Sequence, residues 1–345
     1  MLSEDAIKQA LQTVKYPGFS RDIVSFGLVK EIVSEASGVK VKMTLTTSEP
    51  AIAARIREEG IAAIREAGAR GSIDVLIDVQ APAQAAGVPG PQGIEGVRHV
   101  LAVASGKGGV GKSTVAANLA LALSSQGLKV GLCDCDLYGP SIALMFGCTE
   151  RPTADENDHI IPIERDGLKL MSMGFLLDDG APAVLRGPMV TRYTQQFLRQ
   201  VAWKPLDVLI LDLPPGTGDI QLTIVQTVAL TGAILVTTPQ EVALIDARKA
   251  ASMFEKTNVP VLGIVENMSH FVSPSDGVRH NIFGTGGGQR EAARLKTSLL
   301  GEIPIEIAVR EGGDLGTPIV HSSPESASAL AFQSIGTKIR KQIGV

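Results

Sequence analysis

The fold is decided by the stretch Gly106-Lys107-Gly108-Gly109-Val110-Gly111-Lys112-Ser113. It matches the pattern G-x-x-x-x-G-K-[ST] of a phosphate-binding loop. The apolar run 97–104 before it predicts a strand, and the spacing of apolar residues over 113–126 predicts a helix after it. Strand, glycine-rich loop and helix in this order are the context that the pattern requires, so we expect a nucleotide site here.

The loop supplies groups suited to ATP and Mg²⁺. Its glycines let backbone N–H groups turn toward phosphate oxygens without a side chain in the way. We expect Lys112 to contact the β- and γ-phosphates, the Ser113 hydroxyl to bind Mg²⁺, and Thr114 to make a further phosphate contact. The predicted nucleotide-binding residues are Gly106, Lys107, Gly108, Gly109, Val110, Gly111, Lys112, Ser113, Thr114 and, from a later strand, Asn267.

Carboxylates follow two other apolar runs. Asp212 ends the run 206–211 and is predicted to hold Mg²⁺ through a water molecule. Asp136 is predicted to position the attacking water, with Asp134 as support, because phosphoryl transfer depends on positioning and charge stabilisation. The proline- and glycine-rich segment 213–219 reads as a loop that senses hydrolysis, and the Asn267 carboxamide could read the adenine edge.

Strand and helix patterns alternate through the rest of the chain after residue 97. Near-continuous apolar runs indicate a parallel sheet that is buried on both faces, and their alternation with helices indicates right-handed crossovers. We therefore expect an α/β fold, a mostly parallel doubly wound sheet with helices on both faces. The predicted strands are 97–104, 129–133, 206–211, 233–237 and 261–265, and the clearest helices are 113–126 and 242–257.

The first 80 residues differ in pattern. Helical spacing over 3–14 and 50–67 and strict alternation over 39–46 and 73–79 predict a small α+β domain at 1–80. Residues 81–96, rich in Pro, Gly and Ala, predict a linker, which leaves 97–345 as the P-loop domain.

The composition indicates in which cellular compartment the protein works and which kinds of partner it binds. A net charge of −4 and an aromatic content of 4% argue against a nucleic-acid partner. The chain has no uncharged apolar run of 18 residues and its start is acidic, so we expect no membrane span and no signal peptide. Three cysteines form no disulfide framework, and the prediction is a cytoplasmic protein.

Lys107, directly after the first glycine of the loop, indicates which class of P-loop ATPase the sequence resembles. It resembles the second lysine of the MinD/ParA-like ATPases, and that resemblance implies a catalytic contact across a homodimer interface. The whole set of motifs is similar to the Mrp (ApbC-type) ATPases from about residue 97 to the end, and residues 1–80 resemble a small domain of iron–sulfur assembly proteins. The motifs are Gly106–Ser113, Tyr138-Gly139-Pro140-Ser141, Leu185-Arg186-Gly187-Pro188-Met189, residues 212–219, Glu266-Asn267-Met268-Ser269, Phe283-Gly284-Thr285-Gly286-Gly287-Gly288 and residues 310–318.

The resemblance implies a homodimeric ATPase that carries an iron–sulfur cluster to apo iron–sulfur proteins or assembly factors. Many members of the family have Cys-x-x-Cys shortly after the Asn-Met-Ser block. Here Ser273 and either Ser275 or Asp276 stand at those places, so we assign no iron ligand and expect a weak cluster or none. Of the three cysteines, Cys148 is expected to be the freest, because Cys133 and Cys135 flank Asp134 at a strand end.

Three alternatives remain at this point. An ATP-switched accessory protein would bind no cluster. A MinD/ParA-type positioning ATPase would need a basic amphipathic C-terminal helix or a DNA-binding surface, whereas the cations near the end of 326–345 are ordinary helix-dipole complements. A reductase like the nitrogenase iron protein would need cluster cysteines at the dimer interface.

Overall fold

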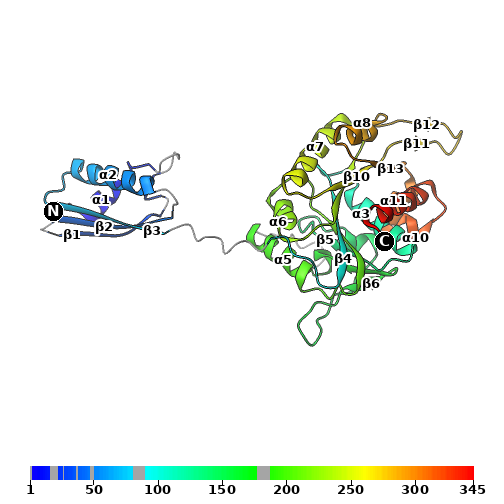
Figure 1. Cartoon of the computed structure of the whole chain (residues 1–345), viewed down its shortest axis with the longest axis horizontal. Coiled ribbons are helices and arrows are strands. Elements are labelled where there is room, and N and C mark those ends of the chain that lie inside the picture. The colour runs from blue at the N-terminus through cyan, green and yellow to red at the C-terminus, as the bar shows by residue number, and fades with distance from the viewer. Residues whose placement is uncertain are drawn as a thin grey trace. The chain divides into compact units, whose positions relative to one another are not determined.

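The computed structural model describes residues 2–15, 22–25, 27–35, 38–46, 50–80, 90–176 and 187–345. The chain divides into two compact units, residues 1–89 and 90–345 (Figure 1). Each has its own hydrophobic core.

The N-terminal unit is a three-stranded sheet with helices packed on one face. Strand β1 pairs antiparallel with the central strand β2, which pairs parallel with β3. The alternating sequence of β2 explains this packing, since Val41 and Met43 are buried while Lys40 and Lys42 are exposed. The elements are α1 (Glu4–Leu11), β1 (Val29–Glu35), β2 (Gly38–Thr46), α2 (Pro50–Glu66) and β3 (Ser72–Gln80). The predicted small α+β fold is confirmed.

The larger unit is built on an eight-stranded sheet in the order β13-β10-β9-β4-β8-β5-β7-β6. All neighbouring strands are parallel except the edge pair β6 and β7. The expected doubly wound α/β architecture is confirmed. The strands are β4 (Val97–Ala104), β5 (Val130–Asp134), β6 (Ile163–Arg165), β7 (Leu168–Met171), β8 (Leu206–Asp212), β9 (Gly232–Thr237), β10 (Val261–Glu266) and β13 (Leu299–Glu302).

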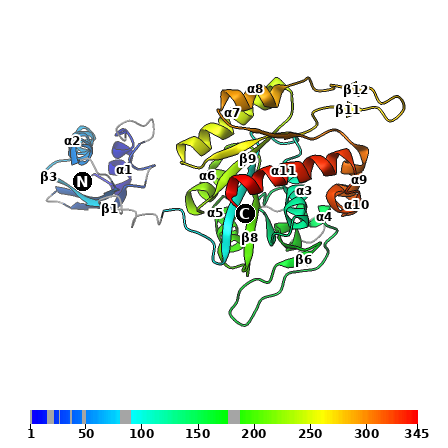
Figure 2. The ribbon, with the colours of Figure 1, turned by 45° about the vertical axis from the view of Figure 1, so that its right-hand side comes forward.

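Helices cover both faces of this sheet (Figure 2). Helix α3 is buried nearly all round because it lies between the sheet and α11, and it is correspondingly apolar on every side. The helices are α3 (Lys112–Ser125), α4 (Ile142–Met145), α5 (Gly187–Arg199), α6 (Asp219–Thr227), α7 (Glu241–Lys256), α8 (Gly287–Arg294), α9 (Ile307–Leu315), α10 (Ile319–Ser322) and α11 (Ala327–Ile343), with a 3₁₀ turn η1 (Met173–Phe175). A short hairpin, β11 (Phe271–Val272) and β12 (Arg279–His280), extends from the unit.

The register of the sheet brings the predicted site residues to one edge. Asp212 pairs with Val103 near the end of β4 on one side and with Asp134 at the end of β5 on the other. Because these strands are parallel, their carboxyl ends meet, as in other open α/β sheets that bind ligands there. The phosphate-binding loop and both carboxylate-bearing strand ends therefore face the same space.

Some elements lie beyond the sequence prediction. Strands β6, β7 and β13 have too few residues for a periodic pattern, and β7 and β13 join the sheet by pairing with β5 and β10, which are not adjacent to them in the chain. Of the proposed linker 81–96, residues 81–89 lie outside the described residues. Gln92 donates its backbone N–H to the Thr227 carbonyl (3.1 Å) and Ile94 belongs to the larger core, so this end of the segment packs on the second unit. Leu185 and Arg186 also lie outside the described residues.

Gly106 provides a test of how closely the loop packs on α7. A Cβ atom at Gly106 would lie 2.0 Å from the backbone of Asp246, whereas one at Gly108 would meet nothing within 4 Å. We expect Gly106→Ala to lower the free energy of unfolding by about 1–3 kcal/mol, as overpacking of a close contact does. Gly108→Ala is the matched control. Urea unfolding without nucleotide measures both, and equal midpoints would contradict the close packing.

Candidate nucleotide site

The phosphate-binding loop joins the end of β4 to the start of α3. Gly109 (φ 81°) and Gly111 (φ 79°) adopt left-handed backbone conformations that favour glycine. A Cβ atom at Gly108 or Gly109 would meet nothing within 4 Å, so the loop backbone faces open space as a phosphate cradle requires. Gly111 is also held by packing, because a Cβ there would lie 2.2 Å from the Asn267 amide nitrogen.

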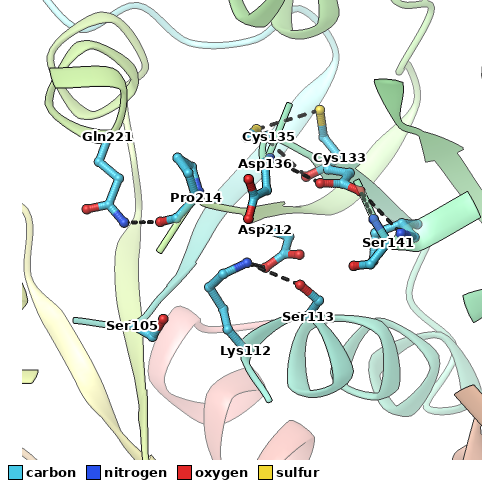
Figure 3. Close-up of polar contacts among 12 residues, drawn as sticks. Ser105, Lys112, Ser113, Cys133, Cys135, Asp136, Ser141, Asp212, Pro214 and Gln221 are labelled. Carbon is cyan, nitrogen blue, oxygen red and sulfur yellow. Dashed lines mark hydrogen bonds and ion pairs between the residues drawn. The ribbon is translucent and has the colours of Figure 1, made fainter. Parts of the chain in front are cut away.

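Lys112 and Asp212 form a buried ion pair at the centre of the site (Figure 3). The Lys112 Nζ lies 2.5 Å from Asp212 Oδ1 and 3.2 Å from the Ser113 hydroxyl. The side chains of Lys112 and Asp212 are 6% and 0% exposed. A pair this deeply buried needs further partners to offset its lost hydration, and Asp212 Oδ2 has none among the described residues. The pair is therefore able to take additional ligands.

These groups fit Mg²⁺. Mg²⁺ prefers oxygen ligands and usually keeps waters and substrate phosphates in its shell. The unpartnered Asp212 Oδ2 and the Ser113 hydroxyl are oxygens of the right kind, and both lie beside Lys112. In the described part of the chain, no group of three or more His, Cys, Asp or Glu side chains is arranged to hold a metal ion.

Asp134 organises the loop that carries Asp136. Its carboxylate accepts hydrogen bonds from the backbone N–H groups of Asp136 (3.1 Å), Ser141 (3.0 Å) and Ile142 (3.2 Å) and from the Ser172 hydroxyl (2.9 Å). Asp134 is therefore engaged with its own loop, whereas Asp136 is only half-buried. Ser172 was not identified from the sequence, because a serine after a short strand has no distinctive spacing.

Negative charge exceeds positive charge among these buried groups. Burial, together with the charge of Asp212, raises the pKa of Asp134 to about 7, although its hydrogen bonds and Lys112 act in the opposite direction. Burial also raises the pKa of Asp136, against the attraction of Lys112. Three carboxyl groups thus lie around one lysine, and an added divalent cation would relieve their repulsion.

Asn267 and Thr114 contribute to the framework of the loop. The Asn267 side-chain amide donates to the Val110 carbonyl (2.9 Å), and the Asn267 backbone N–H donates to Thr237 (2.8 Å). Asn267 therefore ties the end of β10 to the phosphate-binding loop, a contact that the sequence did not reveal; adenine recognition remains a proposal. The carbonyl of Thr114 accepts the Asn118 amide inside α3 (2.9 Å).

Lys107 follows the first glycine of the loop and is half-buried. Within the residues that the structure describes, it makes no ion pair. Its carbonyl accepts a hydrogen bond from the Ser105 hydroxyl (2.8 Å), which fixes the Lys107 peptide. The side chain is thus separate from the Lys112–Asp212 pair.

The thiols and the β11–β12 hairpin do not form a cluster site within one described chain. Ser273 and Ser275 hydrogen-bond to each other (2.9 Å), and Asp276 accepts the Val278 N–H (3.1 Å), so hydrogen bonds of oxygen-bearing side chains close the hairpin turn. Two cysteines lie at the end of β5, with Cys133 and Cys135 sulfurs 3.9 Å apart and buried. The side chain of Cys148 is 8% exposed, the largest value of the three.

No helix in the described ranges is long and apolar enough to cross a bilayer.

Comparisons with known proteins agree with this geometry. The family model described as NUBPL iron-transfer P-loop NTPase matches residues 96–340, and one described as an iron–sulfur cluster assembly protein matches residues 4–77. The iron–sulfur cluster carrier protein of Deinococcus radiodurans is 46% identical over 99% of this chain and 96% of its own length. The protein of that name from Synechocystis is 41% identical over 100% of this chain and 99% of its own length.

Solved structures place the larger unit among nucleotide-binding proteins. A nucleotide-binding protein from Archaeoglobus fulgidus, in complex with ADP, is 41% identical with a TM-score of 0.58, over 64% of this chain and 88% of its own. The cell-division ATPase MinD of Pyrococcus furiosus is 26% identical with a TM-score of 0.55, over 71% of this chain and 99% of its own. With a family model across most of its length and full-length relatives above 40% identity, the chain belongs to the NUBPL-type iron-transfer P-loop NTPases, as its resemblance to the Mrp ATPases predicts.

Proposed function

We propose that this protein is an ATP-hydrolysing carrier of iron–sulfur clusters that switches conformation as a homodimer. The observation that carries the nucleotide half of the proposal is the buried Lys112–Asp212 pair beside Ser113 at the mouth of the glycine-rich loop. The cargo half is supported by the family model and by relatives that are named iron–sulfur cluster carrier proteins. These relatives match nearly the whole chain, so the proposal covers both units.

Nucleotide binding would rearrange the Lys112–Asp212 pair. The phosphate oxygens of ATP would compete with Asp212 for the Lys112 ammonium, which has three N–H donors. Asp212, whose Oδ2 has no hydrogen-bond partner among the described residues, would then be available with Ser113 to hold Mg²⁺. Bound Mg²⁺ would neutralise phosphate charge as it develops. Until the nucleotide arrives, Asp212 thus compensates the charge of the buried Lys112 ammonium.

Asp136 and Lys107 complete the proposed catalytic set. Asp136 is the half-buried carboxyl group of the loop that Asp134 holds, and its raised pKa suits a group that orients a water molecule and exchanges protons with it. Lys107 has no ion-pair partner among the described residues, which suits a cation that completes its contacts in a second subunit. Hydrolysis would then require two copies of the chain.

Cluster binding would depend on few sulfurs. A [4Fe–4S] cluster takes about four thiolates, and one chain has only Cys133, Cys135 and Cys148. The hydrogen bond to Cys133, together with burial, raises the pKa of Cys135 well above its usual range, and burial also raises the pKa of Cys148, so both thiolates that could bind iron are disfavoured. We infer that a cluster is held weakly, through Cys148 or the thiols of a partner protein.

Removing each loop lysine should cause a different defect. Lys112→Ala should abolish turnover and weaken ATP binding at least about tenfold, because a charge-assisted contact to phosphate is lost. Lys107→Ala should keep ATP affinity but lose turnover and ATP-dependent self-association. Steady-state hydrolysis and nucleotide titration measure both effects. Normal turnover in Lys107→Ala would exclude the cross-subunit role.

Asp136→Asn and Asp212→Asn should also differ. Asp136→Asn should bind Mg²⁺-ATP normally but hydrolyse it at least about 100-fold more slowly, since a water-orienting group is lost. Asp212→Asn should instead raise the Mg²⁺ concentration needed for half-maximal turnover. A Mg²⁺ titration of both variants separates them, and identical profiles would remove the distinction between the two roles.

Reconstitution under anaerobic conditions with iron and sulfide tests the cargo site. We expect the wild-type protein to hold less than one cluster per dimer, and Cys148→Ser to lose what remains while ATP turnover stays unchanged. Absorbance and iron content measure the cluster. A stoichiometric cluster that survives in Cys148→Ser would contradict this assignment.

The hairpin offers a matched gain-of-function control for that experiment. The double variant Ser273→Cys with Asp276→Cys creates Cys-x-x-Cys on an exposed turn. It should raise the iron content of the dimer above that of the wild type, because two pairs supply four thiolates.

A further inference from the structure

Ser105, the residue directly before the phosphate-binding loop, contacts two functional segments at once. Its hydroxyl donates to the Lys107 carbonyl (2.8 Å), and its own carbonyl accepts the Gly216 backbone N–H (3.0 Å). Gly216 belongs to residues 213–218, called here the switch loop, which follow Asp212. Ser105 is 1% exposed, so neither hydrogen bond is readily replaced by water.

The root of the switch loop is held firmly. The Leu213 N–H donates to the Val103 carbonyl (3.0 Å), and the Gln221 side-chain amide donates to the Pro214 carbonyl (Figure 3). Leu213 and Pro214 are buried. The other amide atom of Gln221, Oε1, is buried without a partner among the described residues, so it can accept an N–H group if the loop rearranges.

The tip of the switch loop is more exposed than its root. Pro215, Thr217 and Gly218 are exposed, and a Cβ at Gly216 or Gly218 would meet nothing within 4 Å. A displacement imposed at the tip would therefore act on the Gly216 N–H, which is hydrogen-bonded to Ser105.

On the phosphate-loop side of Ser105, the backbone is closely packed. Gly106 packs against the backbone of Asp246 so closely that not even a methyl group fits. Gly106 thus lies against α7, and the carbonyl of the next residue, Lys107, is held by the Ser105 hydroxyl. A serine hydroxyl rotates to suit its acceptor, so this contact can be made or released without moving the strand.

We propose that Ser105 is a positioning residue that couples the switch loop to Lys107. When the γ-phosphate orders the switch-loop tip, the Gly216–Ser105–Lys107 chain of hydrogen bonds sets the Lys107 peptide and presents its ammonium to the second subunit. Loss of the γ-phosphate releases the tip and, through Ser105, the lysine. The inference rests on the proposed cross-subunit role of Lys107 and assigns the regulation of that role to Ser105.

The test compares Ser105→Ala with Lys107→Ala, Ser105→Thr and the control Ser125→Ala. Ser125 also donates its hydroxyl to a main-chain carbonyl (2.9 Å) but lies at the exposed end of α3. We expect Ser105→Ala to lower ATP turnover about tenfold, as loss of one buried hydrogen bond predicts, with ATP affinity changed less than about threefold. Ser105→Thr, which keeps the hydroxyl, should stay closer to wild type, and Ser125→Ala should match wild type.

Comparing the loss of ATP turnover with the loss of ATP affinity shows whether Ser105 couples the switch loop to Lys107 or only shapes the phosphate-binding loop. If Ser105→Ala lowers affinity as much as turnover, Ser105 only shapes the phosphate-binding loop and the inference is wrong. Turnover within about twofold of wild type also overturns it, because the hydrogen bond would then carry no coupling. If Ser105→Ala does not fold, Ser105→Cys, of similar size but a weak donor, takes its place with the same expected loss.

The Lys107→Ala measurement separates the inference from the function on which it rests. Normal turnover in Lys107→Ala defeats the cross-subunit role itself. Defective Lys107→Ala beside normal Ser105→Ala leaves that role intact and removes only the coupling through Ser105.

Discussion

The nucleotide site depends on one interaction, the ion pair between Lys112 and Asp212 with both side chains removed from water. Burying two charges is costly unless the geometry is good and the remaining lone pairs find partners. One oxygen of Asp212 has none among the described residues, and Asp134 and Asp136 add further negative charge nearby. The site therefore holds an excess of negative charge that a bound Mg²⁺ would balance.

The rigid sheet is what allows this arrangement to persist. Parallel pairing of β5, β8 and β4 sets the heights of Asp134, Asp212 and the loop relative to one another. The loop N–H groups that donate to the Asp134 carboxylate, and the Asn267 amide that donates to the Val110 carbonyl, extend that order to segments outside the strands. The tip of the switch loop is exposed, as the proposed sensing of the γ-phosphate would require.

The chain has more of the residues needed for nucleotide binding than of those needed for cluster binding. The nucleotide half has a loop, a cation, a hydroxyl and carboxylates at one edge of the sheet. The cargo half has three buried cysteines and a hairpin closed by Ser273, Ser275 and Asp276. The chain belongs to an iron-transfer family, but this hairpin carries oxygen-bearing side chains and no thiols. In the proposed function, the sulfur ligands of the cargo therefore come from Cys148 or from a partner protein.

The sequence by itself determined the fold class, the strands β4, β5, β8, β9 and β10 and the phosphate-binding loop, because each depends on a local pattern of apolar residues and glycines. It also identified the carboxylates, since the carboxyl ends of parallel strands meet at one edge. Only the tertiary structure decided that Lys112 pairs with Asp212, that Asp134 holds its loop with help from Ser172, and that Ser105 joins Lys107 to the switch loop. Contacts of this kind depend on strand register and on the direction of each hydrogen bond, and neither leaves a periodic trace in a single sequence.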